Sequence, residues 1–402
     1  MNINKLKIQD VCEFVGGSQP PKEVFSNVPK DGYVRLIQIR DYKTDGFITY
    51  IPQELARRFC DEKDIMIGRY GPPIFQICRG LKGAYNVALM KAIPKKNILN
   101  DYLYYFLKQN SLFEYIDSLS LRTGGQTGVD IECLKKYPIH LPALNYQEKV
   151  VKVLSSLDDK IEINNRINSE LENLAKTIYD YWFVQFDFPD ENGKPYKSSG
   201  GKMVYNQELK REIPAGWEVK SLWNIANYFN GLPMQNNRPI NENYLRVIKI
   251  KEMNEGFSEN TELARADIPI EAIVEDGDIL FSWSATLDVK MWSRGKGALN
   301  QHIFKVTSNK FPKTFYYYEL KNYLNHFKMM AERRKTTMGH ITQDHLKQSR
   351  IVIPPHELIS QVHNMIIPMF EKQLLLEKQN QQLTQLRDWL LPMLMNGQIT
   401  VK

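Results

Sequence analysis

The chain has 402 residues, 43% of them hydrophobic, and a formal net charge of +7. This length can supply two apolar cores, so we expect two domains. The basic excess favours a polyanion as partner and leaves a solvated basic surface as the alternative. No run approaches the ~18 apolar residues of a membrane span, and residues 1–10 lack the apolar core of a signal peptide. We therefore expect a soluble, cytoplasmic protein with no membrane partner.

The four cysteines give no sign of a metal site. Cys12, Cys60, Cys78 and Cys133 form no CxxC pair and have no histidine nearby at ligand spacing. A structural zinc site needs four ligands in tight pairs. We expect reduced thiols, buried or partly buried, and no metal.

Residues 1–143 have the pattern of a first α+β domain. Short β-branched and aromatic runs alternate with glycine and proline, which is typical of strands joined by turns. The predicted strands are 33–39, 46–51, 65–70, 74–78 and 86–92, and a helix is predicted over 101–118.

Residues 144–183 change to a heptad pattern, which predicts one long helix. Its two core positions are occupied by Val150, Leu157, Asn164, Leu171 and Ile178 and by Leu154, Ile161, Asn168, Ala175 and Trp182. Asn164 and Asn168 stand where the seam should be apolar. Either they are buried and fix the register, or the seam shifts to Ile163 and Ile167 and leaves them exposed.

Residues 184–214 are polar and rich in turn residues, and they are predicted to be a linker. Residues 215–354 are predicted to be a second α+β domain, with strands near 245–250, 279–282 and 301–306 and a helix over 315–333. Residues 355–397 are predicted to be a second long helix. Its seam is Val362, Met369, Leu376, Leu383 and Leu390. Pro368 is expected to break this helix near its start or to kink it.

An apolar stripe on a lone helix is unstable in water, so the two long helices most simply pair with each other. Because a whole domain separates them in the sequence, an antiparallel coiled coil is possible. The predicted architecture is a pseudo-twofold dumbbell, in which two similar α+β domains are separated by this paired rod.

The second half of the chain repeats the first. The segment 33–41 returns 211 residues later as 244–252, and Gly83-Ala84-Tyr85-Asn86 returns at an offset of 214 as Gly297-Ala298-Leu299-Asn300. The seam residues Val150 and Leu171 return at an offset of 212. Matches over the whole length indicate duplication of a domain together with its helix. Two copies imply two similar sites. The matched positions differ mainly outside the apolar frame, as expected if two sites share a scaffold and read different targets.

No catalytic motif is evident. A P-loop and a glycine-rich βαβ turn are both absent. Two coincidences keep a self-contained enzyme open as an alternative. Gly71-Pro72-Pro73 loosely resembles an amino-methyltransferase loop, and Pro189-Asp190 with Glu208 and Lys210 fits the spacing of a metal-dependent nuclease. A protein scaffold that never touches DNA is the other alternative.

Recurring polar residues suggest binding. Arg35, Gln38 and Arg40 are expected along one strand, and Arg246, Lys249 and Lys251 nearly repeat them. A bulge or strand end would be needed to bring Gln38 to the face of Arg35, and exposed strand charge without a ligand is the alternative. A glycine-containing loop precedes each long helix, and glycine lets a backbone approach a ligand closely. Arginine and lysine can pair with guanine edges or phosphates, and glutamine with adenine. The full set of candidate DNA-binding residues is Arg35, Gln38, Arg40, Arg69, Arg122, Gln126, Thr127, Arg246, Lys249, Lys251, Gln301, Arg334, Lys335, Thr336 and His340.

Several motifs in order give the chain a family resemblance. They are Leu141-Pro142 with Gln147-Glu148, then Leu157-Asp158-Asp159-Lys160-Ile161 with Asn164-Asn165-Arg166-Ile167, Trp182-Phe183 with Phe186 and Phe188, and Ile213-Pro214 with Gly216-Trp217-Glu218. In the second half, 297–302 and Ile353-Pro354-Pro355 agree. Together they resemble the specificity subunits of type I restriction–modification systems over essentially the whole chain. The first half departs by lacking the Ile-Pro-x-Gly-Trp run and by having Val87 where the second half has Gln301.

The resemblance implies that each domain is a target recognition domain reading one half of a bipartite double-stranded DNA site. The paired helices would set the unread spacer and dock two methylation subunits. This chain would be non-catalytic and hold no cofactor. S-adenosylmethionine, ATP and magnesium would belong to the methylation subunits and to endonuclease/translocase subunits of the full complex.

Overall fold

The computed structural model describes residues 4–71, 73–120, 128–333 and 340–401. The chain divides into two compact units, residues 1–160 with 383–402 and residues 161–382. Each unit contains one α+β copy and a segment of both long helices. No helix within the described ranges is long and apolar enough to cross a bilayer.

The first copy contains three small sheets. Their strand orders are β1-β10, β2-β9-β6-β7 and β4-β3-β8-β5. The strands are β1 (Asn4–Lys7), β2 (Cys12–Gly16), β3 (Tyr33–Ile37), β4 (Tyr50–Pro52), β5 (Phe59–Cys60), β6 (Ile65–Gly68), β7 (Ile77–Cys78), β8 (Gly83–Tyr85), β9 (Leu89–Pro94) and β10 (Pro138–Leu141). Strands β3 and β8 are parallel, and every other pair is antiparallel.

The second copy repeats this topology strand for strand. Its orders are β13-β22, β14-β21-β18-β19 and β16-β15-β20-β17, and its parallel pair is β15 with β20. The strands are β13 (Glu218–Ser221), β14 (Asn227–Asn230), β15 (Tyr244–Ile248), β16 (Leu263–Arg265), β17 (Ile273–Val274), β18 (Ile279–Ser282), β19 (Asp288–Met291), β20 (Gly297–Leu299), β21 (Ile303–Thr307) and β22 (Arg350–Ile353). Identical strand orders confirm the predicted duplication.

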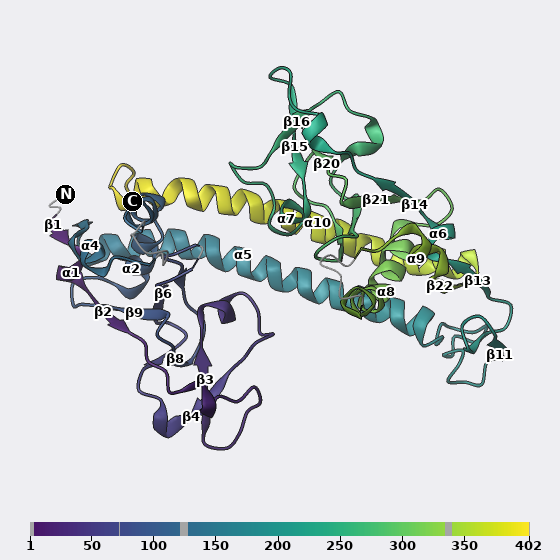
Figure 1. Cartoon of the computed structure of the whole chain (residues 1–402), viewed down its shortest axis with the longest axis horizontal. Coiled ribbons are helices and arrows are strands. Elements are labelled where there is room, and N and C mark those ends of the chain that lie inside the picture. Colours follow the sequence, from purple (N-terminus) through teal and green to yellow (C-terminus); the bar gives the residue numbers. More distant parts are fainter. Residues whose placement is uncertain (1–3, 72, 121–127, 334–339, 402) are drawn as a thin grey trace. The chain divides into compact units, whose positions relative to one another are not determined.

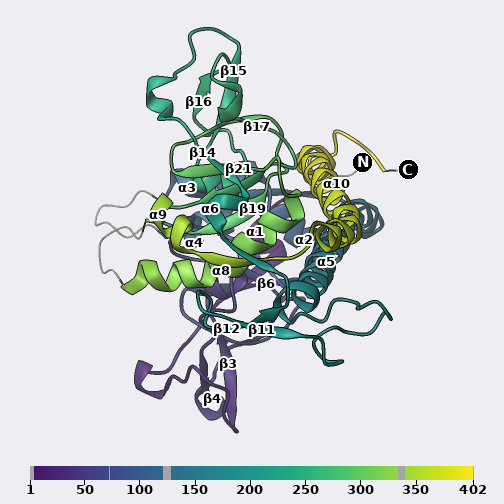
Figure 2. The ribbon, with the colours of Figure 1, turned by 90° about the vertical axis from the view of Figure 1, so that its right-hand side faces the viewer.

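The helices repeat as well. The first copy has α1 (Ile8–Val11), α2 (Asn100–Leu107), α3 (Asn110–Ser118) and α4 (Ile131–Lys136), followed by the long α5 (Leu144–Tyr179). The second has α6 (Leu222–Ile225), α7 (Ile250–Glu255), α8 (Lys313–Arg333) and α9 (Gln343–Gln348), followed by α10 (His356–Met395). In both views, β3 and β4 lie at the tip of their copy away from α1 and α4, and β15 and β16 lie at theirs away from α8 and α9 (Figures 1 and 2).

Several sequence-based bounds were wrong. The helix predicted over 101–118 is two helices, because the buried Gln109 is extended and ends the first one. The strand predicted over 86–92 begins only at Leu89. Asn86 instead makes a turn, in which its side chain accepts the N–H of Ala88 and its carbonyl that of Leu89. Strand β8, just before this turn, was not predicted.

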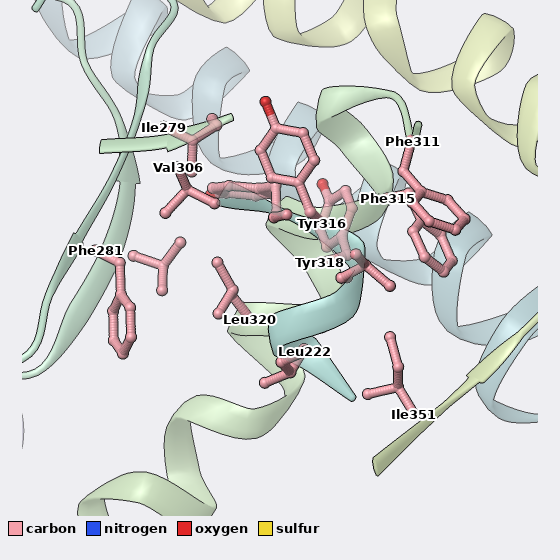
Figure 3. Packing of buried hydrophobic residues seen from close by; sticks show 14 of the residues in the cluster. Leu222, Ile279, Phe281, Val306, Phe311, Phe315, Tyr316, Tyr318, Leu320 and Ile351 are labelled. Carbon is pink, nitrogen blue, oxygen red and sulfur yellow. The ribbon is translucent and has the colours of Figure 1, made fainter. Parts of the chain in front are cut away.

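Each copy has its own apolar core. In the second copy, Phe281 of β18 and Val306 of β21 face Tyr316, Tyr318 and Leu320 of α8 (Figure 3). In the first, strands β6 and β9 pack in the same way against α2, whose residues Tyr102–Leu107 are all buried. Strands β6 and β18 are buried along their whole length, which explains their continuous apolar runs in the sequence. The cysteines are free and buried or partly buried, as predicted.

The two long helices are antiparallel in each unit. In the second unit, Asn164 bonds to Asn380, and four residues further along α5 the side chain of Asn168 bonds to Glu377. The partner number falls as the α5 number rises, so the directions are opposed. In the first unit Tyr146 bonds to Ile399 just beyond α10, and further along α5 Asp158 pairs with Arg387, so the partner number falls there as well. The predicted antiparallel pairing is confirmed.

The seam residues are buried or partly buried as expected. They are Val150, Leu157, Leu171, Ile178, Val362, Met369, Leu376, Leu383 and Leu390. Asn164 is fully buried, whereas Ile163 is 40% exposed, so the seam does not shift to the isoleucines. Pro368 does not break α10, which is continuous from His356 to Met395.

The segment 184–214 is more structured than the predicted linker. Helix α5 ends in one π-helical turn at Asp180–Val184, and the hairpin of β11 (Met203–Asn206) and β12 (Arg211–Pro214) follows. Phe188 stacks between Tyr196 and Trp217, with ring centroids 4.6 and 5.0 Å away. The scattered aromatic residues of this polar stretch thus form a small core of their own.

Candidate nucleic-acid interface

The first candidate group does not lie along one strand as predicted. Strand β3 ends at Ile37, Gln38 precedes a 3₁₀ turn and Arg40 lies inside that turn, at Ile39–Tyr42. The Asp41 carboxylate accepts the backbone N–H of Gln38 at 3.1 Å, which stabilises the turn and ends the strand.

The second strand ends in the same way, so the single strand predicted for Arg246, Lys249 and Lys251 was also wrong. Strand β15 ends at Ile248, and Lys249 is the N-cap of α7, which contains Lys251. The Glu252 carboxylate accepts the N–H of Lys249 at 3.3 Å. Only Arg35 and Arg246 of the six residues therefore lie on a strand.

Many polar groups at these two tips already have partners within the chain. Arg35 lies 3.0 Å from Asp45, and the ammonium group of Lys249 forms an ion pair with Glu262. The side-chain amide of Gln38 donates to Thr49 at 3.0 Å. Nucleic-acid contacts from these three side chains would therefore compete with existing interactions.

A second region repeats with closer backbone agreement. Gly17 and Gly231, 214 residues apart, each pack against the carbonyl of an asparagine, Asn86 and Asn300. An added Cβ would lie 2.0 Å from the Asn86 oxygen and 2.3 Å from that of Asn300, so only glycine fits at either position. The backbone N–H of Asn86 donates to Ile37 at 3.1 Å, and that of Asn300 donates to Ile248 at the same distance.

Beside this glycine–asparagine contact, one further residue of each copy has the same backbone environment. Arg69 follows β6, and Trp283 follows β18. The N–H of Arg69 donates to Ala88 at 2.8 Å, and that of Trp283 donates to the matching His302 at 3.4 Å. The two residues thus occupy the same position relative to the loop that carries each asparagine.

The backbone carbonyl groups of Arg69 and Trp283 also accept equivalent hydrogen bonds. The oxygen of Arg69 accepts the N–H of Val129 at 3.0 Å, and that of Trp283 accepts the N–H of Ile341 at 2.9 Å. Both donors lie on the segment that returns toward the long helix of their copy. Main-chain hydrogen bonds on both sides therefore hold these two positions equivalently, whatever their side chains.

The side chains at this equivalent position differ. The guanidinium of Arg69 lies 5.1 Å from the Tyr70 ring centroid and donates to the Val87 carbonyl at 3.4 Å. The indole N–H of Trp283 donates to Asn230 at 2.9 Å. Both Tyr70 and Val87 are exposed on the surface.

Two imidazole rings lie close to the Trp283 indole. Those of His302 and His340, both exposed, have centroids 5.6 and 5.5 Å from the indole. The Gln301 amide nitrogen lies 3.5 Å from the His302 ring. Of the sequence-predicted candidates, the structure thus brings together Gln301 and His340 in the second copy. Arg69 occupies the equivalent region of the first.

Other sequence candidates lie outside the described residues. They are Arg122, Gln126, Thr127, Arg334, Lys335 and Thr336. Sequence reasoning missed Asn230 and His302 as members of the second-copy group. Continuing the offset of 214 past Asn86 and Asn300 would have matched His302 with Ala88 and drawn attention to the change.

The acidic residues of the nuclease-like coincidence have structural roles. The Asp190 carboxylate accepts the N–H groups of Asn192 and Lys194 in a turn, and Glu208 forms an ion pair with Arg350. Within the described ranges, no group of three or more histidine, cysteine or acidic side chains could hold a metal ion. Pro72, in the methyltransferase-like loop, lies outside the described residues.

Two copies of one fold, with equivalent positions that carry different, partly buried side chains, are typical of a binding protein with two related sites. The family model of the type I restriction modification DNA specificity domain matches residues 2–173 and 214–385. The chain belongs to this family.

Relatives support the same assignment. The chain is 27% identical to the type I restriction enzyme MjaIX specificity subunit of Methanocaldococcus jannaschii, over 98% of this chain and 93% of the relative. It is 24% identical to the HindI specificity subunit of Haemophilus influenzae, over 76% and 79%. The crystal structure of a type I restriction–modification S subunit from M. genitalium aligns with a TM-score of 0.56 at 15% identity, over 98% and 96%, and this likeness supports the fold.

Proposed function

We propose that this chain is the DNA-recognition subunit of a type I restriction–modification complex, with each copy reading one half of a bipartite target. The observation that carries the proposal is the equivalent backbone around Arg69 and Trp283, which presents unlike side chains. Side-chain and base-edge contacts supply sequence specificity, whereas backbone contacts to phosphate position the protein. One fold with two different surfaces is what reading two different half-sites requires.

The reactions of the complex belong to other subunits in this proposal. Methylation with S-adenosylmethionine, and translocation and cleavage with ATP and magnesium, would take place on the methylation and endonuclease subunits in the cytoplasm. This chain would contribute target choice and would be non-catalytic, which fits the structural uses found for Asp190 and Glu208.

The number of methylation subunits is part of the proposal. Both long helices expose apolar side chains at an offset of 212: Ile163 (40%) and Leu174 (50%) on α5 match Leu375 (58%) and Leu386 (44%) on α10. Trp389 adds a further exposed ring on α10. Such side chains at repeated positions suit the same partner bound twice, so we propose two methylation subunits for each chain.

Substituting glutamate for Leu174 and for Leu386, singly and together, tests this stoichiometry. Each single variant should bind one methylation subunit less tightly, and the double variant should weaken both. Native mass spectrometry of the complex gives the count, and Glu162→Gln, on the exposed side of α5, is a control. Two subunits retained by the double variant would contradict docking at these positions.

The spacer between half-sites would be set by α5 and α10. Insertion of one heptad into each helix, near Asn164 and near Leu376, preserves the seam and adds about 10 Å at 1.5 Å per residue. The preferred spacer should then lengthen by up to about 3 base pairs at 3.4 Å each. Selection from a randomised-spacer library measures this, and an unchanged spacer would mean that the helices do not determine it.

DNA recognition itself is tested by a salt titration of DNA binding, with and without the methylation subunit, followed by methylation mapping. Binding that weakens steeply with salt, and a bipartite methylated sequence, are expected. Absence of DNA binding, with and without the methylation subunit, would favour the scaffold alternative, and methylation by the isolated chain would favour the self-contained enzyme.

A further inference from the structure

The two equivalent positions, Arg69 and Trp283, offer a ligand different polar groups. In the first copy, Arg69 is the basic side chain of interest. Among the described residues no carboxylate forms an ion pair with it, in contrast to Arg35, which pairs with Asp41 and Asp45. The Nε atom of Arg69 is buried and has no hydrogen-bond partner within the part of the chain that the structure describes.

The neighbours of Arg69 hold the guanidinium plane and leave space beside it. The Tyr70 ring lies on one side, and the Val87 carbonyl accepts from Nη1. Gly16 contributes no side chain, and a Cβ there would still lie 3.8 Å from Nη1. A stacked, oriented guanidinium without a carboxylate partner suits a bidentate contact to the O6 and N7 acceptors of guanine.

The second copy offers different chemistry at the same place. Asn230 stands where the first copy has Gly16, and the Trp283 indole fixes the orientation of its amide by donating to Oδ1. Among the described residues nothing accepts a hydrogen bond from the Asn230 nitrogen, and Oδ1 keeps a second acceptor site. Asparagine and glutamine amides pair with adenine, and an apolar ring edge suits the thymine methyl group.

We propose that Arg69 and Trp283 mark the specificity centres of the two copies, with Arg69 reading a guanine and the Trp283–Asn230 pair reading an A·T base pair. This inference rests on the proposed function and adds the class of base that each copy recognises. The Trp283 side chain is a positioning residue for the Asn230 amide, which makes the base contact. The flanking amide of Gln301 belongs to the same centre.

The first test uses the full chain in complex with its methylation subunit. Arg69→Lys keeps the charge but loses the bidentate fork, and Arg57→Lys, at an exposed arginine in the same copy, is the matched control. In methylation maps, Arg69→Lys should relax one G·C position of the first half-site, by about tenfold or more in discrimination. The second half-site should not change.

The second test uses Asn230→Ala and Trp283→Phe. The phenylalanine retains a smaller ring against Phe304 and lacks the indole N–H that orients Asn230, so folding should be retained. Both variants should relax an A·T position of the second half-site, with Asn230→Ala having the larger effect. Trp223→Phe, in a stacked pair with Tyr228, is the control for loss of an indole.

The outcomes separate this inference from the proposed function. A wild-type complex with a bipartite site, combined with unaltered half-sites in the Arg69 and Asn230 variants, would overturn the inference alone. Equal weakening on all sequences would show phosphate contacts and would also overturn it, as would relaxation at the wrong class of base pair. A wild-type complex without sequence preference would remove the proposed function itself.

Discussion

The guanidinium of Arg387 on α10 lies 2.8 Å from the carboxylate of Asp158 on α5, and the Tyr105 hydroxyl of α2 donates to the other oxygen of that carboxylate at 2.7 Å. The side chains of Arg387 and Asp158 are only 18% and 20% exposed. The contact therefore joins three helices of the first unit through one charged group that is largely shielded from water. Its loss would leave a carboxylate without its cation.

Arg387→Ala should lower the free energy of unfolding by roughly 1.5–3 kcal/mol, the usual range for a hydrogen bond to a charged group. Chemical denaturation of the full chain measures the change. Asp388→Asn is the matched control, because it removes the more exposed partner of the same arginine and should cost less than about 1 kcal/mol. Equal losses in the two variants would contradict the importance of the Asp158 contact.

Asn164→Ala should also destabilise the chain, by roughly 1–3 kcal/mol. The buried Asn164 amide donates to Gln379 and Asn380, both at 2.8 Å, and the substitution removes both bonds. Asn173→Ala, at an exposed position of the same helix, should leave stability unchanged or slightly improved, because alanine favours helix. Thermal unfolding of the two variants decides, and a stable Asn164→Ala protein would make this polar layer dispensable.

Gly17→Ala should be destabilising because its Cβ would lie 2.0 Å from the Asn86 carbonyl oxygen, a backbone atom. The expected loss is about 1–3 kcal/mol, as for other overpacked sites. The adjacent Gly16→Ala is a strict control, since the nearest atom to its Cβ is an arginine side-chain nitrogen at 3.8 Å. Denaturation midpoints that match for the two variants would refute the close-approach explanation.

The pH dependence of stability should reveal Glu319. Burial raises the pKa of this carboxyl to about 7, above its ordinary value of 4.5, while the hydrogen bond from Tyr179 opposes the rise. Between these two values the folded state holds a proton that the unfolded state has released, so raising the pH from about 5 to 7.5 should lower the free energy of unfolding.

The variant Glu319→Gln removes the titrating group and keeps an oxygen that can accept from Tyr179. Its stability should fall less than that of the wild type over the same pH range. Glu172→Gln is the control, since it removes a carboxylate that is half exposed and pairs with Lys321. A wild-type pH dependence in Glu319→Gln would assign the effect to other groups.

The sequence predicted the duplicated architecture well because the apolar frame is periodic and occurs twice. Leu157 and Leu376 could be placed on helix seams by heptad spacing alone, and the antiparallel pairing followed from the need to bury both stripes. The turn after Ile37 was missed because it depends on one side-chain contact, from Asp41 to the backbone of Gln38. The alternation of apolar and polar residues does not predict such a contact.

The sequence also named Gln301 and His340 as candidates but could not show that they meet around Trp283. Asn230, Trp283 and His340 lie far apart in the chain, and they meet because β14 and β18 both pair with β21 while the segment before α9 returns to the Trp283 carbonyl. Charge and residue type pointed instead to Arg35 and Lys249, whose ion pairs with acidic neighbours became evident only in the folded structure.

The main-chain bonds that hold residues 69 and 283 have an evolutionary consequence. Because main-chain hydrogen bonds hold the backbone at these positions, a change of codon can replace the displayed side chain while those bonds are kept. A host under pressure from new invading DNA could thus acquire a different recognition sequence by substitution at one surface. The sister half-site and the assembly would be inherited unchanged.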